Sequence, residues 1–300
     1  MTVEHRFGTV TLTKPPVKVV TLGLQESEGV LLLGLAPTGR TDTDITDWYN
    51  AFLTSMQLPG SELPQLVSTG AGVPVDAIAK LQPDLVIAFE TPVSQAAYDS
   101  LSKVAPVILP PKGLDLADWK ATLTFFGQIL GRTAIAQQQI AATEAALTNS
   151  AADYPELRKT SAMYVAASSI PGSDITVFAP DSAPSRFLAS LGMKASPSAG
   201  IARSLPAALT KATQPANLLP RSRSNELSPD VLVVVVPGSD YGQYTANKAI
   251  QGMADFGTKN ILYVTGPDAF SMDRASALAL QWASRNIVPE IGRLAYAATK

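Results

Sequence analysis

The residue types that most often carry out catalysis or bind metal ions are scarce in this sequence. It has no cysteine, which excludes disulfides, thiolate catalysis and cysteine-bound metals within the chain. It has one histidine, His5, near the N-terminus, where we expect a solvated side chain. A serine–histidine–aspartate triad or a histidine-rich zinc site would depend on this single residue. The sequence therefore argues against both kinds of site.

One glycine-rich turn, TGAGVP at residues 69–74, is the nearest approach to a phosphate-binding loop. Its glycines lack the spacing of a dinucleotide-binding loop, and Pro74 interrupts the short helix that follows. A two-lobed α/β enzyme, such as a sugar-nucleotide transferase, is therefore an alternative without a clear phosphate site.

The composition predicts a globular protein with a real core. Its 300 residues can form one large domain or two of ordinary size, and 46% are hydrophobic against 16% charged. The net charge is -2 with no basic block, so nothing indicates nucleic acid. The apolar runs are far shorter than the roughly 20 residues that span a bilayer. The N-terminus MTVEHRFGTV lacks the apolar core of an export signal, so an exported protein would carry its signal outside this sequence.

One phrase occurs in both halves of the chain. KLQPDLVIAFE at residues 80–90 and LSPDVLVVVV at 227–236 each place Leu, any residue, Pro and Asp before an unbroken apolar run. An apolar strand without alternation is typical of a parallel sheet that helices cover on both faces. We therefore expect two similar lobes, with a ligand held between them.

The elements around these phrases alternate between strand and helix. Strands are expected at 17–23, 84–89, 106–110, 161–168 and 175–180, with a loop at 47–52 that carries Trp48 and Tyr49. A helix at 133–151 has few large apolar residues and could bridge two bodies. A closing helix begins near Ser271 or Asp273 and breaks at Pro289, while segment 194–225 has no clear pattern. The predicted domains are an N-terminal lobe, 1–132, an interlobe helix, 133–151, and a C-terminal lobe, 152–300.

Several motifs, in this order, resemble one protein family. They are FGTVTLTKPPVKVVTLG, LLLGLAPTG, VDAIAKLQPDLVIA, LGRTAIAQQQIA and VFAPDSAPSRFLASLGM. Together they cover nearly the whole chain and resemble the substrate-binding proteins of ABC importers for iron-siderophores, haem and cobalamin.

The resemblance implies an α/β fold of two Rossmann-like lobes with mostly parallel sheets, joined by one long helix, the class III periplasmic binding protein fold. It implies no catalysis and no intrinsic cofactor or metal site. The expected ligand is a ferric siderophore, an Fe(III) complex bound in the interlobe cleft by a monomer and delivered to an ABC permease. A haem or cobalamin carrier and an adhesin or sensor are alternatives. The expected location is extracytoplasmic, either periplasmic or as a cell-surface lipoprotein whose signal and anchor lie outside this sequence.

Residues that follow predicted strands are the candidates for binding such a ligand. Arginine can pair with carboxylate or hydroxamate oxygens, and aromatic rings can stack on the ligand. Tyr241 and Tyr244 form the strongest pair. The candidates are Arg40, Trp48, Tyr49, Glu90, Ser168, Ser169, Arg186, Tyr241, Tyr244 and Arg274.

The resemblance also implies one acidic docking residue for the permease on each lobe. Asp76 falls at the family position in the first lobe. In the second lobe the corresponding position lies near Ser222, and Glu226 is the nearest acid, out of register. The expected docking residues are therefore Asp76 and, with a departure from the pattern, Glu226.

Overall fold

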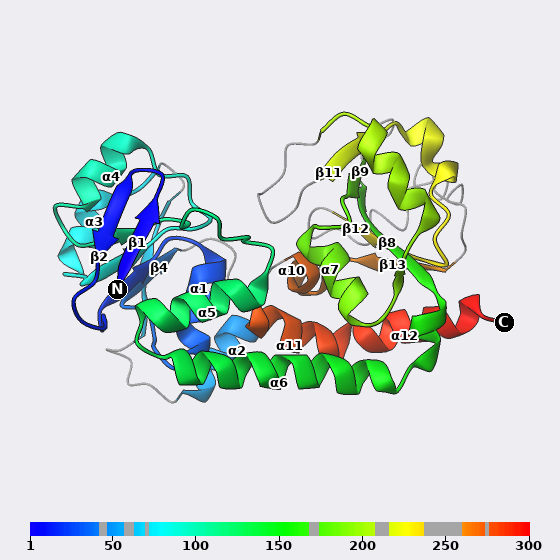
Figure 1. Cartoon of the computed structure of the whole chain (residues 1–300), viewed down its shortest axis with the longest axis horizontal. Coiled ribbons are helices and arrows are strands. Elements are labelled where there is room, and N and C mark those ends of the chain that lie inside the picture. The colour runs from blue at the N-terminus through cyan, green and yellow to red at the C-terminus, as the bar shows by residue number, and fades with distance from the viewer. Residues whose placement is uncertain are drawn as a thin grey trace. The chain divides into compact units, whose positions relative to one another are not determined.

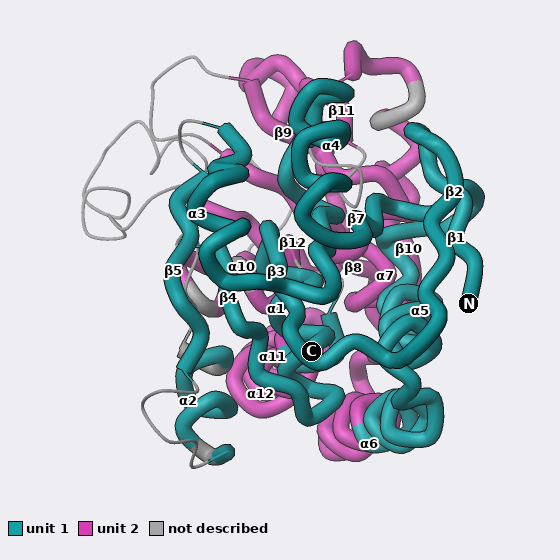
Figure 2. The backbone as a smooth tube through the Cα atoms, turned by 90° about the vertical axis from the view of Figure 1, so that its left-hand side faces the viewer, with its two compact units in different colours: residues 1–142, 276–278 teal, residues 143–275, 279–300 magenta. Residues whose placement is uncertain are grey.

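The chain divides into two compact units. The structure, a computed structural model, describes residues 1–41, 47–56, 63–69, 72–167, 174–207, 216–236, 260–273 and 276–300. Unit 1 consists of residues 1–142 and 276–278, and unit 2 of residues 143–275 and 279–300 (Figure 2).

Unit 1 is built on a sheet of five parallel strands. Their order is β5-β4-β3-β6-β7, so β3 and β6 are central. The unbroken apolar runs explain this pattern, because every residue of β3 and β6 is buried. The strands are β3 (Val19–Thr21), β4 (Gly39–Thr41), β5 (Gln65–Val67), β6 (Leu85–Ile87) and β7 (Val107–Ile108).

Helices connect these strands (Figure 1). Val20, Val86 and Val107 of the sheet form one core with Ile78 of α3 and Leu101 of α4. The helices are α1 (Leu24–Leu32), α2 (Asp47–Ser55), α3 (Val75–Lys80), α4 (Gln95–Leu101) and α5 (Trp119–Ile129). The predicted loop at 47–52 is wrong, because this segment forms α2 and buries Tyr49 completely.

A hairpin of β1 (Thr2–His5) and β2 (Gly8–Thr11) precedes the sheet. His5 is buried, so the expectation of a solvated histidine is wrong. Its Nδ1 accepts a hydrogen bond from Phe7 N, and its Nε2 lies 3.2 Å from the carbonyl oxygen of Val107, in β7. The hairpin therefore packs against β7 through this ring. Burial lowers the pKa of His5.

Unit 2 has a mixed sheet in the order β11-β9-β8-β12-β13, with β10 also paired to β8. β8, β10, β12 and β13 run parallel, while β9 and β11 are antiparallel to their neighbours. The strands are β8 (Ser161–Ala167), β9 (Ile175–Phe178), β10 (Lys194–Ala195), β11 (Ala216–Leu219), β12 (Val231–Val235) and β13 (Ile261–Val264). The expectation of mostly parallel sheets in an α/β fold is confirmed for both units.

The described helices of unit 2 correct one expectation and confirm another. The closing helix is divided into three, and Ser271 and Asp273 lie inside the first of them rather than at a cap. The break expected at Pro289 is confirmed, because the second helix ends at Asn286 and the third begins at Val288. Pro289 lies in the first turn of this third helix, where its missing N–H group costs no hydrogen bond. The helices are α7 (Ala183–Ser190), α10 (Gly266–Asp273), α11 (Ala277–Asn286) and α12 (Val288–Ala298), with 3₁₀ helices η2 (Pro155–Lys159), η3 (Pro197–Ser204) and η4 (Arg221–Glu226).

Two helices carry the chain from one unit to the other. α6 (Thr133–Ala152) matches the long helix expected at 133–151, and the boundary falls between Ala142 and Thr143. Figure 2 shows this change of colour within α6. The boundary near the C-terminus falls within α11, after Leu278.

The aspartates of the repeated phrase perform the same task in both units. The carboxylate of Asp84, before β6, accepts hydrogen bonds from Val17 N and Lys18 N, just before β3. Asp230, before β12, accepts hydrogen bonds from the backbone N and the hydroxyl of Ser161, at the start of β8, at 2.6 and 2.8 Å. In each unit, one carboxylate joins the amino ends of two neighbouring parallel strands.

Candidate functional site

The carboxyl edge of the unit 1 sheet is the natural place for a ligand, since open α/β sheets bind ligands there. β3 ends at Thr21 and leads into α1, and β6 ends at Ile87 and leads into Phe89 and Glu90. Because both strands are parallel and adjacent, the start of α1 lies beside Glu90.

Glu90 binds the N-terminus of α1. Its Oε2 accepts hydrogen bonds from Leu24 N at 2.7 Å and from Gln25 N at 3.0 Å. These are two of the backbone N–H groups that an α-helix leaves without partners in its first turn. The carboxylate therefore caps α1 from a segment 66 residues further along the chain.

Glu26 lies within this same turn and is completely buried. Its Oε1 accepts a hydrogen bond from Phe89 N at 2.9 Å, and its Oε2 has no hydrogen-bond partner among the described residues. Burial raises the pKa of Glu26 to about 8, with a second contribution from the negative charge of Glu90; backbone N–H groups act in the opposite direction. Glu26 is therefore an uncharged acid at neutral pH.

Gly23 leaves the space that these two glutamates share. A Cβ atom there would lie 2.7 Å from Glu26 Oε2 and 2.7 Å from Glu90 Cβ. The φ angle of Gly23 is −145°, which any residue adopts, so the glycine is required by space rather than by backbone conformation. Both side chains therefore border one small space at the start of α1.

Arg40 and Tyr49, two of the predicted binding residues, contact each other. The guanidinium carbon of Arg40 lies 4.9 Å from the centre of the Tyr49 ring, and Arg40 Nη1 donates to the carbonyl oxygen of Thr41 at 2.9 Å. Both side chains are buried, and burial raises the pKa of Tyr49. This pair lies at the end of β4, the same edge of the sheet as Glu90.

Glu28, also buried on α1, has a partner from the end of the chain. Ser276 Oγ donates a hydrogen bond to Glu28 Oε2, and residues 276–278 belong to the same unit as α1. Sequence reasoning missed Glu26 and Glu28. The available signal was the polar run QESE inside an apolar helix.

In unit 2, α10 follows the carboxyl end of β13. Tyr164 of β8 donates a hydrogen bond to Asp273 of α10, and Trp282 Nε1 lies 3.4 Å from Asp268 Oδ1. Burial raises the pKa of Tyr164 far above its usual value, and Asp273 adds to this effect. The first contact holds α10 against β8 of the sheet, and the second holds α10 against α11.

The remaining predicted binding residues are placed only in part. Arg186 lies half-buried on α7, whose N-cap is Ser182. Trp48 lies on α2, but its side chain is outside the description. The other predicted residues lie outside the described part of the chain: Ser168, Ser169, Tyr241, Tyr244 and Arg274.

The two predicted docking acids differ in their surroundings. Asp76 is exposed in the first turn of α3. Glu226, in η4, forms a two-pronged ion pair with Arg223 at 2.5 and 2.7 Å. The hydrogen bonds from Arg223 lower the pKa of Glu226. Arg223, in the same 3₁₀ helix, therefore already neutralises part of the charge of Glu226.

A pocket of about 70 Å³ lies elsewhere in unit 2. It is lined by the start of β8, the end of β9, α7 and β10, including Tyr164, Phe178 and Leu188. Because β8 contributes its first half, the pocket is displaced from the carboxyl edge. We assign it no ligand.

The described residues also bear on two other kinds of site. They contain no cluster of three or more His, Asp or Glu side chains that could hold a metal ion. They also contain no helix with the length and hydropathy needed to cross a membrane.

Comparisons with known proteins give a consistent result. The family model described as periplasmic binding protein matches residues 19–252. The Fe(3+) dicitrate-binding periplasmic protein FecB of Escherichia coli is 32% identical over 108 residues, which span 36% of this chain and only 34% of FecB.

Solved structures share the fold over nearly their whole length. A periplasmic solute binding protein from Mycobacterium smegmatis has 23% sequence identity and a TM-score of 0.78, with 98% of each chain covered. PiaA of Streptococcus pneumoniae, solved in complex with ferrichrome, has 17% identity and a TM-score of 0.76, again with 98% of each chain covered. With the family model matching most of the sequence, this chain belongs to the periplasmic binding protein family.

Proposed function

We propose that this protein is the substrate-binding component of an ABC importer that captures a ferric siderophore and delivers it to a membrane permease. Membership of the family makes the chain an extracytoplasmic binding protein rather than an enzyme. The observation that carries the choice of an iron chelate is the 32% identity with FecB, whose name states an Fe(3+) dicitrate ligand. The ferrichrome complex of PiaA supports the same choice through a shared fold.

The proposed ligand surface lies at the carboxyl edges of the sheets. In unit 1 it includes the start of α1 with Glu90, and the Arg40–Tyr49 pair at the end of β4. In unit 2 it includes Arg186 of α7. The candidates beyond the described residues, Tyr241 and Tyr244 among them, remain part of the proposal. The siderophore already saturates its iron, so protein ligands to the metal are not required.

The proposal extends to the way the protein works with its partners. Helix 133–151 would join the two lobes, 1–132 and 152–300, and limit their movement. Asp76 and Glu226 would dock onto the permease, with Glu226 the weaker because Arg223 competes for it. The protein would act as a monomer, held at the membrane by a lipid anchor.

Tryptophan fluorescence tests the proposal directly. Ferric dicitrate, ferrichrome, a ferric catecholate, haem and cobalamin are titrated into the folded protein. We expect saturable quenching by one class of ferric siderophore at sub-micromolar concentration. Quenching by haem or cobalamin alone would instead establish the alternative carrier, and no response to any compound would refute uptake of these chelates.

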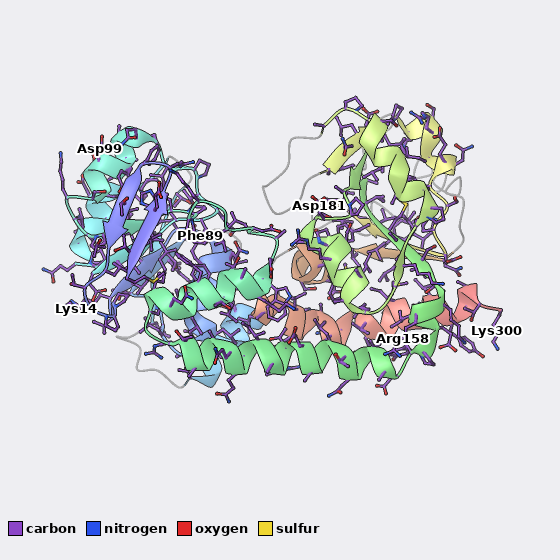
Figure 3. All side chains as sticks on the ribbon, viewed as in Figure 1. Lys14, Phe89, Asp99, Arg158, Asp181 and Lys300 are labelled. Atoms are coloured by element: carbon purple, nitrogen blue, oxygen red, sulfur yellow. The ribbon has the colours of Figure 1, made fainter. Side chains whose placement is uncertain are left out.

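Matched variants locate the site. Trp48→Phe is expected to remove most of the quenching, whereas Trp119→Phe, on α5, is expected to keep it. Arg186→Gln should weaken binding of an anionic chelate about ten-fold, as expected for loss of one charge-assisted pair. Arg158→Gln, an exposed arginine in η2 (Figure 3), should leave the affinity unchanged.

A further inference from the structure

The first turn of α1 contains an unusual run of buried polar side chains. Gln25, Glu26, Ser27 and Glu28 are each at most 3% exposed. Gln25 donates to the carbonyl oxygen of Leu116, Ser27 to that of Gly23, and Glu28 accepts from Ser276. Glu26 differs, because one of its two carboxyl oxygens has no partner among the described residues.

An ionised carboxylate in this position would be strongly unfavourable. A buried charge without a cation or a full set of hydrogen bonds is costly, and the group becomes neutral instead. The hydrogen bond from Phe89 N occupies Oε1, so the proton belongs on Oε2, where it makes this oxygen a donor. The proton of Glu26 therefore points into the space left by Gly23, beside Glu90.

The charged groups around Glu26 come from several elements. Glu90, after β6, is the group whose charge acts on Glu26. Glu28 of α1 is engaged by Ser276, and Arg40 of β4 lies over Tyr49 of α2. α5 presents Phe125 and Phe126, which form an aromatic cluster with Phe89 (labelled in Figure 3). Among the described residues, Glu90 is thus the natural acceptor for the proton.

We propose that Glu26 and Glu90 share one proton at the N-terminus of α1, and that this proton allows the site to bind an anionic iron chelate. With the proton in place, the pair carries a single negative charge, which the N–H groups of Leu24 and Gln25 stabilise. Loss of the proton to solvent would leave two negative charges at the edge where the chelate binds. Glu26 is then a positioning residue that acts through Glu90, and this inference rests on the proposed function.

The consequence is a selective dependence on pH. Affinity for an anionic chelate should fall about two- to five-fold between about pH 6 and about pH 9, as one added charge about 10 Å away would produce for effective dielectric constants from about 80 down to about 35. A neutral chelate with the same iron centre should show little change. The ferric complexes of N-succinyl-desferrioxamine, which is anionic, and N-acetyl-desferrioxamine, which is neutral, share one iron centre and differ only in the terminal acyl group, which carries this charge.

The experiment measures both affinities across this pH range for the wild type, Glu26→Gln and Glu290→Gln. Glu290 is an exposed glutamate on α12, and its variant should keep the wild-type profile. Glu26→Gln retains the shape and cannot ionise, so its profile for the anionic chelate should be flat. A profile with the same slope as that of the wild type would overturn the inference.

An infrared titration separates this inference from the proposed function. If neither complex binds, the proposed function fails for hydroxamates, but the proton can still be examined in the protein alone. The carbonyl stretch of a protonated carboxylic acid should be present at neutral pH, should be missing in Glu26→Gln, and should titrate at lower pH in Glu90→Gln. Absence of a band that depends on Glu26 would refute the shared proton whether or not chelates bind.

Discussion

At the scale of single residues, two side chains with the same chemistry behave differently because of their surroundings. Glu90 is partly exposed and uses its charge to cap α1. Glu26, which borders the same small space beside Gly23, is fully enclosed and is neutral at pH 7. This division of roles between adjacent carboxyl groups follows from burial, which penalises the charged form, and from the repulsion between like charges.

The first prediction is that Glu26 makes stability decrease as pH rises. Its pKa is raised from 4.5 to about 8 on folding, so its contribution is complete below about pH 4.5 and is lost as the pH rises through about 8. Relative to Glu26→Gln, the wild type should lose on the order of 5 kcal/mol over this range, at up to about 1.4 kcal/mol per pH unit. Urea unfolding at several pH values measures this, and parallel curves for both proteins would contradict it.

Gly23 provides a second prediction at this scale. Gly23→Ala places a methyl group within 2.7 Å of Glu26 Oε2, so the carboxyl must move and stability should fall by about 1–3 kcal/mol. Gly200→Ala is the matched control, because a Cβ at Gly200 meets nothing within 4 Å. Thermal unfolding compares the two variants. Equal melting temperatures would show that the space beside Gly23 is not restrictive.

At the scale of elements, the repeated Pro-Asp phrase has a specific structural role. The proline ends the preceding segment, and the aspartate then binds backbone or hydroxyl donors at the start of the neighbouring strand. The interaction is charge-assisted and joins segments 66 to 69 residues apart. Each lobe uses it to align the amino ends of its two central parallel strands.

The third prediction concerns these carboxylates. Asp84→Ala leaves Val17 N and Lys18 N without their carboxylate acceptor, and should destabilise the protein by about 1–3 kcal/mol. Asp181→Ala removes an exposed aspartate (Figure 3) and should change stability by less than about 0.5 kcal/mol. Chemical denaturation measures the free energy of unfolding of both variants. A similar small effect for both would show that the Asp84 carboxylate does not stabilise the start of β3.

At the scale of the whole molecule, α6 and α11 both continue from one unit into the other. Beside these transitions, Gln281 Nε2 of α11 donates a hydrogen bond of 2.9 Å to Thr143 Oγ1 of α6. Thr143 is completely buried and is the first residue of unit 2 on α6. A second hydrogen bond, from Ser150 Oγ to the carbonyl oxygen of Ser284, joins the same helices further along. The two connecting helices are thus held together by polar contacts.

The fourth prediction tests this contact. Thr143→Val keeps the side-chain shape but removes the acceptor, so stability should fall by about 1 kcal/mol. Thr148→Val, at an exposed position on the same helix, should be nearly neutral. Hydrogen exchange of α11 amides should also accelerate in Thr143→Val alone. Unchanged exchange would mean that the hydrogen bond contributes little to the packing of these helices.

The sequence by itself determined the order and kind of most elements. Unbroken apolar runs identified β3, β6, β8 and β12 as buried strands, and the helix predicted at 133–151 agrees with α6 to within a residue. These features are local, because side-chain periodicity and the backbone limits of proline act over a few residues. The motifs that resemble the family extended the prediction from single elements to the whole fold and to a binding role. Segment 47–52 was misread because its helical burial depends on distant partners.

Only the tertiary structure decided which polar groups meet. Glu26 and Phe89 are 63 residues apart, His5 and Val107 are 102 apart, and Glu28 and Ser276 are 248 apart. No local pattern encodes such pairs, and the same glutamate could equally lie on an exposed helix face. Whether a carboxyl group is charged depends on solvent access and on nearby charge, and both are set by the packing of distant segments. The proton of Glu26 is therefore a property of the folded chain.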